Sequence, residues 1–173
     1  MSRLKDVRVL TAAAMLLAVS VILSFFKISI TEVMEIRFSN LPVAVAGMLF
    51  GPGVGCAVGA LSDLLGYVVR PTGPYFPGFT ISSALSGVIF GLLLHKKRSL
   101  GRIVLASVLY EGFIGVLLTA VWLHVLYSTP LPVLLAARIP KELVMLAFHV
   151  VVLTLLVKPA AELTRMAGER KRT

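Results

Sequence analysis

Long apolar runs separated by short polar segments account for most of this chain. A helix needs about 20 apolar residues to cross a bilayer core, and most of the runs have roughly that length. The pattern predicts an all-α integral membrane protein, a bundle of six transmembrane helices in a single domain. The predicted helices cover residues 8–26, 39–50, 53–70, 77–95, 102–127 and 133–157.

The stretch Gly51-Pro-Gly-Val-Gly55 decides how many times the chain crosses. It interrupts an uncharged run from Leu41 to Ser62 that could pass for one helix of ordinary length. Glycine and proline side by side favour a turn, since glycine permits unusual backbone angles and proline breaks a preceding helix. We therefore predict two helices here. The first is short, so either it begins nearer Arg37 or the turn lies within the membrane.

The distribution of basic residues supports the turn. With six crossings, both termini and the His95–Arg98 loop share one side, and twelve of the seventeen Lys and Arg lie there; merging the two helices leaves six inside and eleven outside. Loops on the cytoplasmic side carry the excess of Lys and Arg, so both termini are predicted to be cytoplasmic. The five basic residues on the outer side are Lys27, Arg37, Arg70, Arg138 and Lys141.

Composition narrows the class of protein. The 173 residues are 58% hydrophobic and 14% charged, with a mean hydropathy of +0.96. Such a chain is typical of a membrane protein with little extramembrane structure. The net charge of +9 is concentrated at predicted cytoplasmic helix ends, which favours orientation in the bilayer and contact with anionic lipid over binding of nucleic acid. The basic segment 158–173 is expected to be a cytoplasmic tail.

Enzymatic chemistry is not indicated. The sequence has no G-x-x-x-x-G-K-[ST] loop, no H-E-x-x-H and no G-x-S-x-G motif, which are typical of ATPases, zinc peptidases and serine hydrolases. A single cysteine, Cys56, and two aspartates, Asp6 and Asp63, leave no thiolate cage or multi-aspartate metal site. We expect neither a catalytic residue nor a metal or cofactor.

Polar residues at membrane depth are the candidate binding residues, because a charge placed there is costly and needs a partner or a function. Asp63, Tyr67 and Arg70 are spaced i, i+4, i+7, which places them on one helix face. Two interpretations remain open: ion pairs that close the bundle, for example Asp63 with Arg138, or a pocket for a flat heterocycle bearing an acidic group. The other residues expected at this level are Tyr75, Phe76, Trp122, Lys141, Glu142 and, deeper, His149.

Small residues recur at four-residue spacing, which lets helix backbones approach closely in a membrane. Glycines at 51, 55 and 59 form one row, and Ser83, Gly87 and Gly91 form another. We expect both rows to pack within the chain. A third row, Ala14 and Ala18, could pack within the chain or face another protein.

Three segments carry a family resemblance: Leu41-Pro-Val-Ala-Val-Ala-Gly-Met-Leu-Phe-Gly-Pro52, Leu61-Ser-Asp-Leu-Leu-Gly66 and Pro71-Thr-Gly-Pro-Tyr-Phe-Pro-Gly-Phe-Thr80, of which Gly73 to Thr80 is the most specific part. The chain resembles the substrate-binding S components of energy-coupling factor (ECF) vitamin transporters over roughly residues 12–157, and most of all the folate-specific members. Arg138-Ile-Pro-Lys-Glu142 is similar to the family's segment that opens the last helix.

The resemblance implies a vitamin-capture subunit in a prokaryotic plasma membrane. An outer pocket would be gated by the loop at 27–38, and Ala14 and Ala18 would dock on a transmembrane T component driven by two ATPase subunits. For folate, Asp63 or Glu142 would accept hydrogen bonds from the pterin. Asn40 would also read the heterocycle, Tyr67, Tyr75, Phe76 or Trp122 would stack on it, and Arg37, Arg70, Arg138 and Lys141 are candidates for the carboxylates.

Other functions remain open. Members of the same family bind riboflavin, thiamine or pantothenate, and a fold does not fix its ligand. The outer side carries the five basic residues against four acidic ones, Glu32, Glu35, Asp63 and Glu142, which favours an anion over cationic thiamine. The rival from another class is an autonomous small secondary transporter or channel.

Overall fold

The structure, a computed structural model, describes residues 7–26, 28–31, 34–36, 38–71, 74–96 and 99–169. Helical segments make up nearly all of this part of the chain, with one short hairpin after the first helix. In order, the elements are α1 (Val7–Phe25), β1 (Ile28–Thr31), β2 (Met34–Ile36), α2 (Asn40–Phe50), α3 (Pro52–Val69), α4 (Pro77–Leu94), α5 (Leu100–Leu109), the π-helix η2 (Tyr110–Leu118), α6 (Thr119–Tyr127) and α7 (Leu131–Glu169).

Five helical segments in the described part of the chain are long and apolar enough to cross a membrane. They are α1, α3, α4, the continuous segment Leu100–Tyr127 and the first 26 residues of α7, up to Leu156. α2 has 11 residues and is about 17 Å long at 1.5 Å per residue, which is less than the hydrocarbon core of a bilayer. Many large apolar side chains on these helices are exposed, as expected of surfaces that face lipid.

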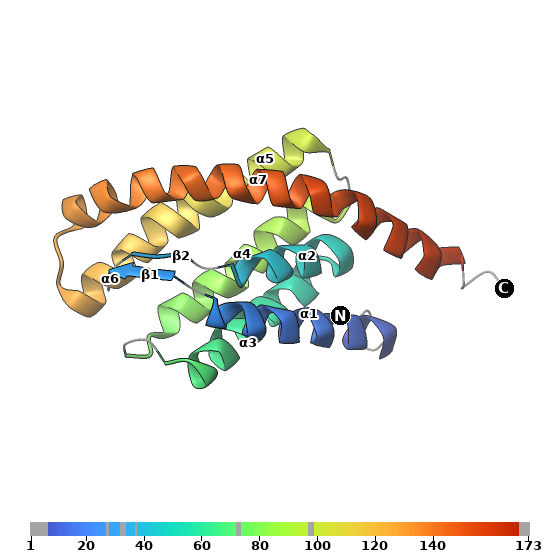
Figure 1. Ribbon diagram of the computed structural model, residues 1–173, viewed down its shortest axis with the longest axis horizontal. Helices are drawn as coiled ribbons and strands as arrows, with labels where there is room; N and C mark the ends of the chain where they lie inside the picture. The colour runs from blue at the N-terminus through green and yellow to red at the C-terminus, as the bar shows by residue number, and fades with distance from the viewer. Residues whose placement is uncertain are drawn as a thin grey trace.

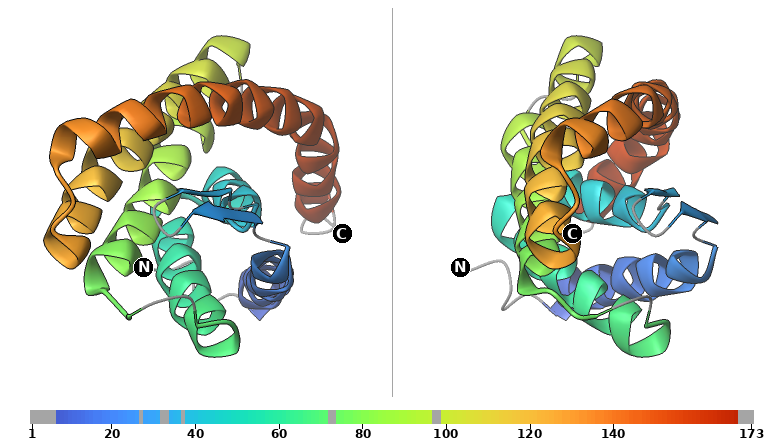
Figure 2. Two further views of the ribbon diagram at one scale, coloured as in Figure 1. Left: turned by 60° about the vertical axis from the view of Figure 1, so that its left-hand side comes forward. Right: turned by 90° about the vertical axis from the view of Figure 1, so that its left-hand side faces the viewer.

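The helices run lengthwise, so the connections gather at two ends of the molecule (Figure 1). At one end lie the start of α1, the α2–α3 turn, the α4–α5 connection and the end of α7; at the other lie the β1–β2 hairpin and the α3–α4 and α6–α7 connections. Figure 2 shows α1 to α4 packed together, with the α5–η2–α6 segment and α7 forming a second layer. α7 continues as helix beyond the predicted end at 157.

The chain turns sharply at Gly51, as the sequence predicts. Gly51 has a φ of 96°, between the end of α2 and the start of α3. Residues with a side chain rarely adopt such an angle, and Pro52 suits the first position of the helix that follows. The Cα of Gly47 lies 2.8 Å from where a Cβ on Gly55 would be. α2 and α3 therefore form a closely packed helical hairpin around this turn.

Glycines also bring α3 and α4 into direct backbone contact. A Cβ on Gly87 would lie 2.0 Å from the carbonyl oxygen of Gly55, and a Cβ on Gly59 would lie 2.2 Å from that of Ser83. No side chain fits at these distances, so these glycines pack within the chain. The prediction made from the two rows is confirmed at these positions.

Two local features differ from the helices and loops predicted from the apolar runs. The predicted helix 102–127 contains the π-helix η2, and the loop 27–38 contains two antiparallel strands in which Ile28 pairs with Ile36 and Ser29 with Glu35. In η2 the carbonyl of Gly115 accepts a hydrogen bond of 2.9 Å from Arg138 Nη1, and that of Ile114 accepts one of 2.6 Å from Thr119 Oγ1. These side chains use backbone acceptors of the π-helix, and apolar periodicity carries no sign of them.

Candidate substrate-binding site

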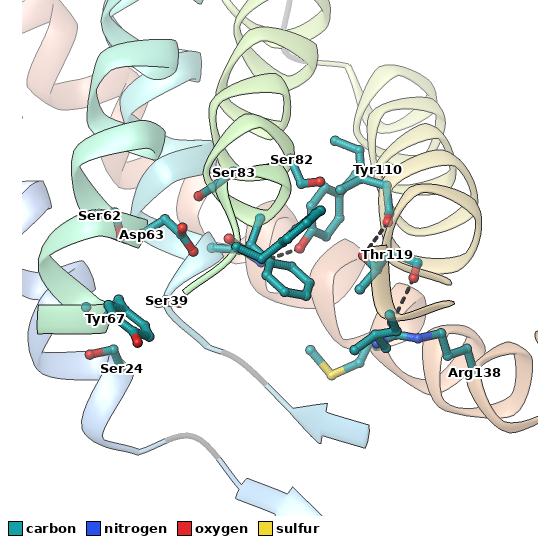
Figure 3. A pocket seen from close by; sticks show the side chains of 18 of the residues that line it. Ser24, Ser39, Ser62, Asp63, Tyr67, Ser82, Ser83, Tyr110, Thr119 and Arg138 are labelled. Atoms are coloured by element: carbon teal, nitrogen blue, oxygen red, sulfur yellow. Dashed lines mark hydrogen bonds between the residues drawn. The ribbon is translucent and has the colours of Figure 1, made fainter. Parts of the chain in front are cut away.

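A cavity of about 180 Å³ lies between α3 and α4 on one side and η2 and α7 on the other. Figure 3 shows Asp63 and Tyr67 on one wall and Arg138 on the other. The cavity has an exposed end, where Tyr75 is 41% exposed, and a buried end, where His149 is 1% exposed. Most of the predicted binding residues line it, namely Asn40, Asp63, Tyr67, Arg70, Tyr75, Phe76, Arg138, Lys141 and Glu142.

The α3–α4 wall carries a chain of hydroxyl groups that ends on a carboxylate. Thr80 Oγ1 donates a hydrogen bond of 2.8 Å to Asp63 Oδ2. The same Thr80 oxygen lies 3.0 Å from the hydroxyl of Tyr75, and the rings of Tyr75 and Tyr67 are 5.2 Å apart. Asp63 is one turn before Tyr67 on α3, so the predicted helix face turns toward the cavity. This wall offers a hydrogen-bond acceptor beside two aromatic rings.

Arg70 and Arg37 are two further residues predicted to bind an anion. Arg70 lines the cavity, and its Nη1 donates to the carbonyl oxygen of Phe25 at 2.5 Å. This bond holds the guanidinium at the end of α1. Arg37 lies outside the described residues, so its predicted role stays a prediction.

Trp122 stands behind the wall of the cavity. Its ring centroid is 5.5 Å from that of Phe76, and its Nε1 donates a hydrogen bond of 3.0 Å to Ser82 Oγ. Phe76 and Ser82 both line the cavity. Trp122 therefore positions two lining residues in this structure, whereas direct stacking was predicted from its sequence position.

The η2–α7 wall concentrates charge. Lys141 Nζ and Arg138 Nη1 both approach the same oxygen of Glu142, Oε1, at 2.9 and 3.4 Å. A Cβ on Gly115 would lie 3.1 Å from Glu142 Oε2 and also 3.1 Å from Glu111 Oε2. The two carboxylates thus meet over a glycine that has no side chain to separate them. This wall presents cations and carboxylates in a buried site, where each needs its partners.

At the buried end of the cavity, Asn40 and His149 were predicted to belong to the pocket level, whereas Tyr110 and Glu111 were not predicted as binding residues. Glu111 Oε1 lies 2.5 Å from His149 Nδ1, and Asn40 Nδ2 donates to the hydroxyl of Tyr110. Tyr110, Glu111 and His149 all line the cavity. A signal was present, because ionisable residues within membrane spans are functional candidates by default. The pairing joins residues 38 positions apart, and nothing in the sequence gives that contact.

The two alanines predicted to face a partner lie on the exposed surface of α1. Ala14 and Ala18 are exposed, whereas Ala13 and Ser20 on the same helix are buried. Ser20 Oγ donates to the carbonyl of Ser39 at 2.6 Å and lies 2.5 Å from Ser62 Oγ. α1 is thus held to α2 and α3 through its buried face, which leaves the small-residue face toward the surroundings.

These features define a multi-pass membrane protein whose helices enclose a polar, partly aromatic cavity for a small molecule. Among the described residues, no group of three or more His, Cys, Asp or Glu could hold a metal ion. The chain belongs to the family described as "ECF transporter, substrate-specific component", whose sequence model matches residues 8–157. Members of this family bind substrate for a transporter, so the chain is a transporter component and not an enzyme.

Three similar proteins illustrate the relationship. A folate transporter, FolT, of Clostridium novyi is 34% identical over 87% of this chain and 88% of its own length. A folate transporter, FolT, of Leuconostoc mesenteroides is 28% identical over 84% of this chain and 82% of its own. A crystal structure of FolT bound with folic acid superposes with a TM-score of 0.77 at 31% identity, covering 83% of this chain and 90% of that one.

Proposed function

We propose that this chain captures folate as the substrate-binding subunit of an ECF importer. The observation that carries the proposal is the cavity itself, which brings the carboxylates of Asp63 and Glu142 and several aromatic rings together with the cations Arg70, Arg138 and Lys141. Folate has a flat heterocycle with N–H donors at one end and carboxylates at the other, so it matches both kinds of group. The similarity to FolT proteins, one of them solved with folic acid, supports the same ligand.

We assign the ends of the ligand by chemistry. Asp63 would accept hydrogen bonds from N–H groups of the pterin, and Tyr67, Tyr75 or Phe76 would stack on the ring. Arg70 at the exposed end and Arg37 would bind the glutamate carboxylates, and Arg138 and Lys141 would hold Glu142 beside the heterocycle. A guanidinium can grip a carboxylate with two parallel hydrogen bonds. Within this proposal Asn40 and Glu142 contact the heterocycle as well.

The membrane arrangement is also part of the proposal. The six helical segments would cross a prokaryotic plasma membrane with both termini cytoplasmic, and α2 would be completed by the segment before it. The excess of basic residues at one end supports this orientation, as does the position of the start of α1 and the end of α7 at that same end (Figure 1). The β1–β2 hairpin would then cover the outer pocket.

A binding titration tests the ligand. The purified protein in detergent would be titrated by calorimetry with folate and, for comparison, with riboflavin, thiamine and pantothenate, whose chemical groups differ from those of folate. We expect folate alone to bind with a dissociation constant well below 1 μM, which corresponds to a free energy more favourable than about −8.2 kcal/mol. Failure of folate to bind below micromolar concentration, or tighter binding of another vitamin, would overturn the assignment.

The partners are tested separately. We propose that the subunit docks on a transmembrane T component with two ATPase subunits, because it belongs to a family of substrate-specific components. Co-expression with these subunits and purification under mild detergent should recover a complex that imports folate only with ATP. Folate transport by the isolated chain in liposomes would contradict this arrangement.

A further inference from the structure

His149 lies at the buried end of the cavity, with one ring nitrogen hydrogen-bonded and the other without a partner among the described residues. Its Nδ1 lies 2.5 Å from Glu111 Oε1 and 3.2 Å from the backbone carbonyl oxygen of Met145. A carbonyl oxygen and a carboxylate oxygen both accept hydrogen bonds, so Nδ1 carries the hydrogen. Nε2 is buried and has no hydrogen-bond partner among the described residues. Because His149 lines the cavity, a bound molecule is a natural partner for this nitrogen.

Burial favours a neutral ring at His149. The surrounding cluster holds two carboxyl groups, Glu111 and Glu142, and two basic side chains, Arg138 and Lys141, all linked through the contacts at Glu142 and over Gly115. A protonated imidazole would place a further charge at a site that is 1% exposed, where an uncompensated charge is costly. With Nδ1–H donating to Glu111, the neutral ring leaves a lone pair on Nε2.

The ring is also held sterically. Tyr110 contacts it edge-on, with centroids 5.4 Å apart and planes at 75°, and Phe148 lies against it at 6.1 Å. Tyr110 itself accepts a hydrogen bond from Asn40. Aromatic contacts from η2 and α7 and the bond to Glu111 thus fix the direction of Nε2. An acceptor that is fixed in advance loses little freedom on binding, which favours selectivity.

We propose that His149 Nε2 accepts a hydrogen bond from an N–H group of the ligand's heterocycle, and that Glu111 is a positioning residue that holds the imidazole in this tautomer. This inference rests on the proposed function, since the pterin of folate carries both a ring N–H and an amino group. A ligand without a donor at this point would leave the buried nitrogen unpaired. Such mismatches discriminate between ligands more strongly than apolar contacts do.

Two ligands separate a direct contact from a structural role. His149→Asn keeps an amide nitrogen near the Nδ1 position, so it can still donate to Glu111, but it has no atom at the Nε2 position. We expect it to weaken folate binding by about ten- to a hundred-fold. Binding of p-aminobenzoylglutamate, which lacks the heterocycle, should be unchanged. His124→Asn is the matched control, because His124 bonds the carbonyl of Thr129, and it should change neither ligand's affinity.

Glu111 is tested by conservative rescue. Glu111→Gln keeps an acceptor for the Nδ1 hydrogen and should retain most of the folate affinity. Glu111→Ala removes the acceptor and should lose affinity for folate selectively over p-aminobenzoylglutamate. Equal losses for both ligands in Glu111→Ala or in His149→Asn would show a merely structural role and overturn the proposal.

Nitrogen-15 NMR reports directly which nitrogens of the His149 ring carry a hydrogen. The chain has three histidines, so imidazole-labelled protein gives few signals, and His149→Asn assigns the relevant pair. We expect an unprotonated Nε2 in the ligand-free protein and an upfield shift of its resonance when folate is added. A protonated Nε2 in the free protein, or no shift on saturation with folate, would overturn the proposal. If wild-type protein binds no folate at all, the proposed function fails, and the ligand-free spectrum still reports the tautomer.

Discussion

Arg70 Nη1 donates a hydrogen bond of 2.5 Å to the backbone carbonyl of Phe25, the last residue of α1. The final carbonyls of a helix have no partner within the helix, and here a side chain from the end of α3 supplies one. Arg70 also lines the cavity. The bond therefore ties the wall of the proposed folate site to the point where the chain leaves α1 for the β1–β2 hairpin.

Arg70→Ala should speed the release of folate. The hairpin follows α1 directly, so loss of the bond frees the end of the helix that carries the proposed cover. A bond from a charged donor contributes at most about 1.5–3 kcal/mol, and solvent weakens this exposed one, so we expect a dissociation rate about two- to tenfold higher, measured by stopped-flow fluorescence of Trp122. Arg102→Ala is the control, because Arg102 bonds the carbonyl of Leu93 at the other end of the molecule. An unchanged dissociation rate in Arg70→Ala would contradict the linkage.

Asp63→Asn should weaken folate binding by about ten- to a hundred-fold. The amide can still accept the hydrogen bond from Thr80, but it loses the charge that strengthens bonds from ligand N–H groups, worth about 1.5–3 kcal/mol each. Thr80→Val separates the two contributions, since it removes the bond to Asp63 and leaves the carboxylate charged. Calorimetry should show the smaller loss for Thr80→Val. The reverse order would mean that the ligand does not use the charge.

Gly87→Ala should destabilise the protein whether or not ligand is present. A Cβ there would lie 2.0 Å from the carbonyl oxygen of Gly55, so α3 and α4 would have to move apart, at a cost of about 1–3 kcal/mol or more. Thermal unfolding in detergent should show a lower midpoint. Gly53→Ala is the matched control, because no atom lies within 4 Å of its Cβ position. It should raise the midpoint slightly, by removing a flexible residue from α3.

The turn at Gly51 and the walls of the cavity illustrate what the sequence can predict. The turn follows from local chemistry, because a glycine next to a proline rarely continues a helix. The distribution of basic residues supports the same turn independently. Asp63 and Tyr67 were predicted to share a helix face because they are one turn apart, and both line the cavity. Spacing along one helix is a local property, so it transfers directly from sequence to structure.

Contacts between distant segments were not predictable in the same way. The pairing of Glu111 with His149 depends on how η2 packs against α7. The sequence indicates how deep each residue lies in the membrane, but not how far apart the two side chains are. Trp122 is predicted to stack on the ligand, whereas in the structure it contacts Phe76 and Ser82, which line the cavity, and is not itself a lining residue. Its rotation about the helix axis is set by packing, and periodicity gives little indication of it in α6, where most residues are apolar.

Ala14 and Ala18 are predicted to form the docking face for the T component. Both are exposed on α1, and small residues at this spacing let two membrane helices approach closely. The double variant Ala14→Leu, Ala18→Leu should bind folate normally, because neither residue lines the cavity. It should lose the complex, since overpacking a close contact costs about 1–3 kcal/mol per site, equivalent to about tenfold or more in recovery of the T component.

The measurement is co-purification under mild detergent, followed by folate binding on the same sample. Ala136→Leu is the control, because Ala136 is an exposed small residue on α7, far along the chain from the alanines of α1, and it should leave recovery of the complex unchanged. Retention of the T component by the double variant would show that partner docking uses another face. Loss of folate binding together with the complex would instead show that α1 supports the pocket. The opposite face of this helix contacts the pocket side of the bundle through the bonds of Ser20 to Ser39 and Ser62.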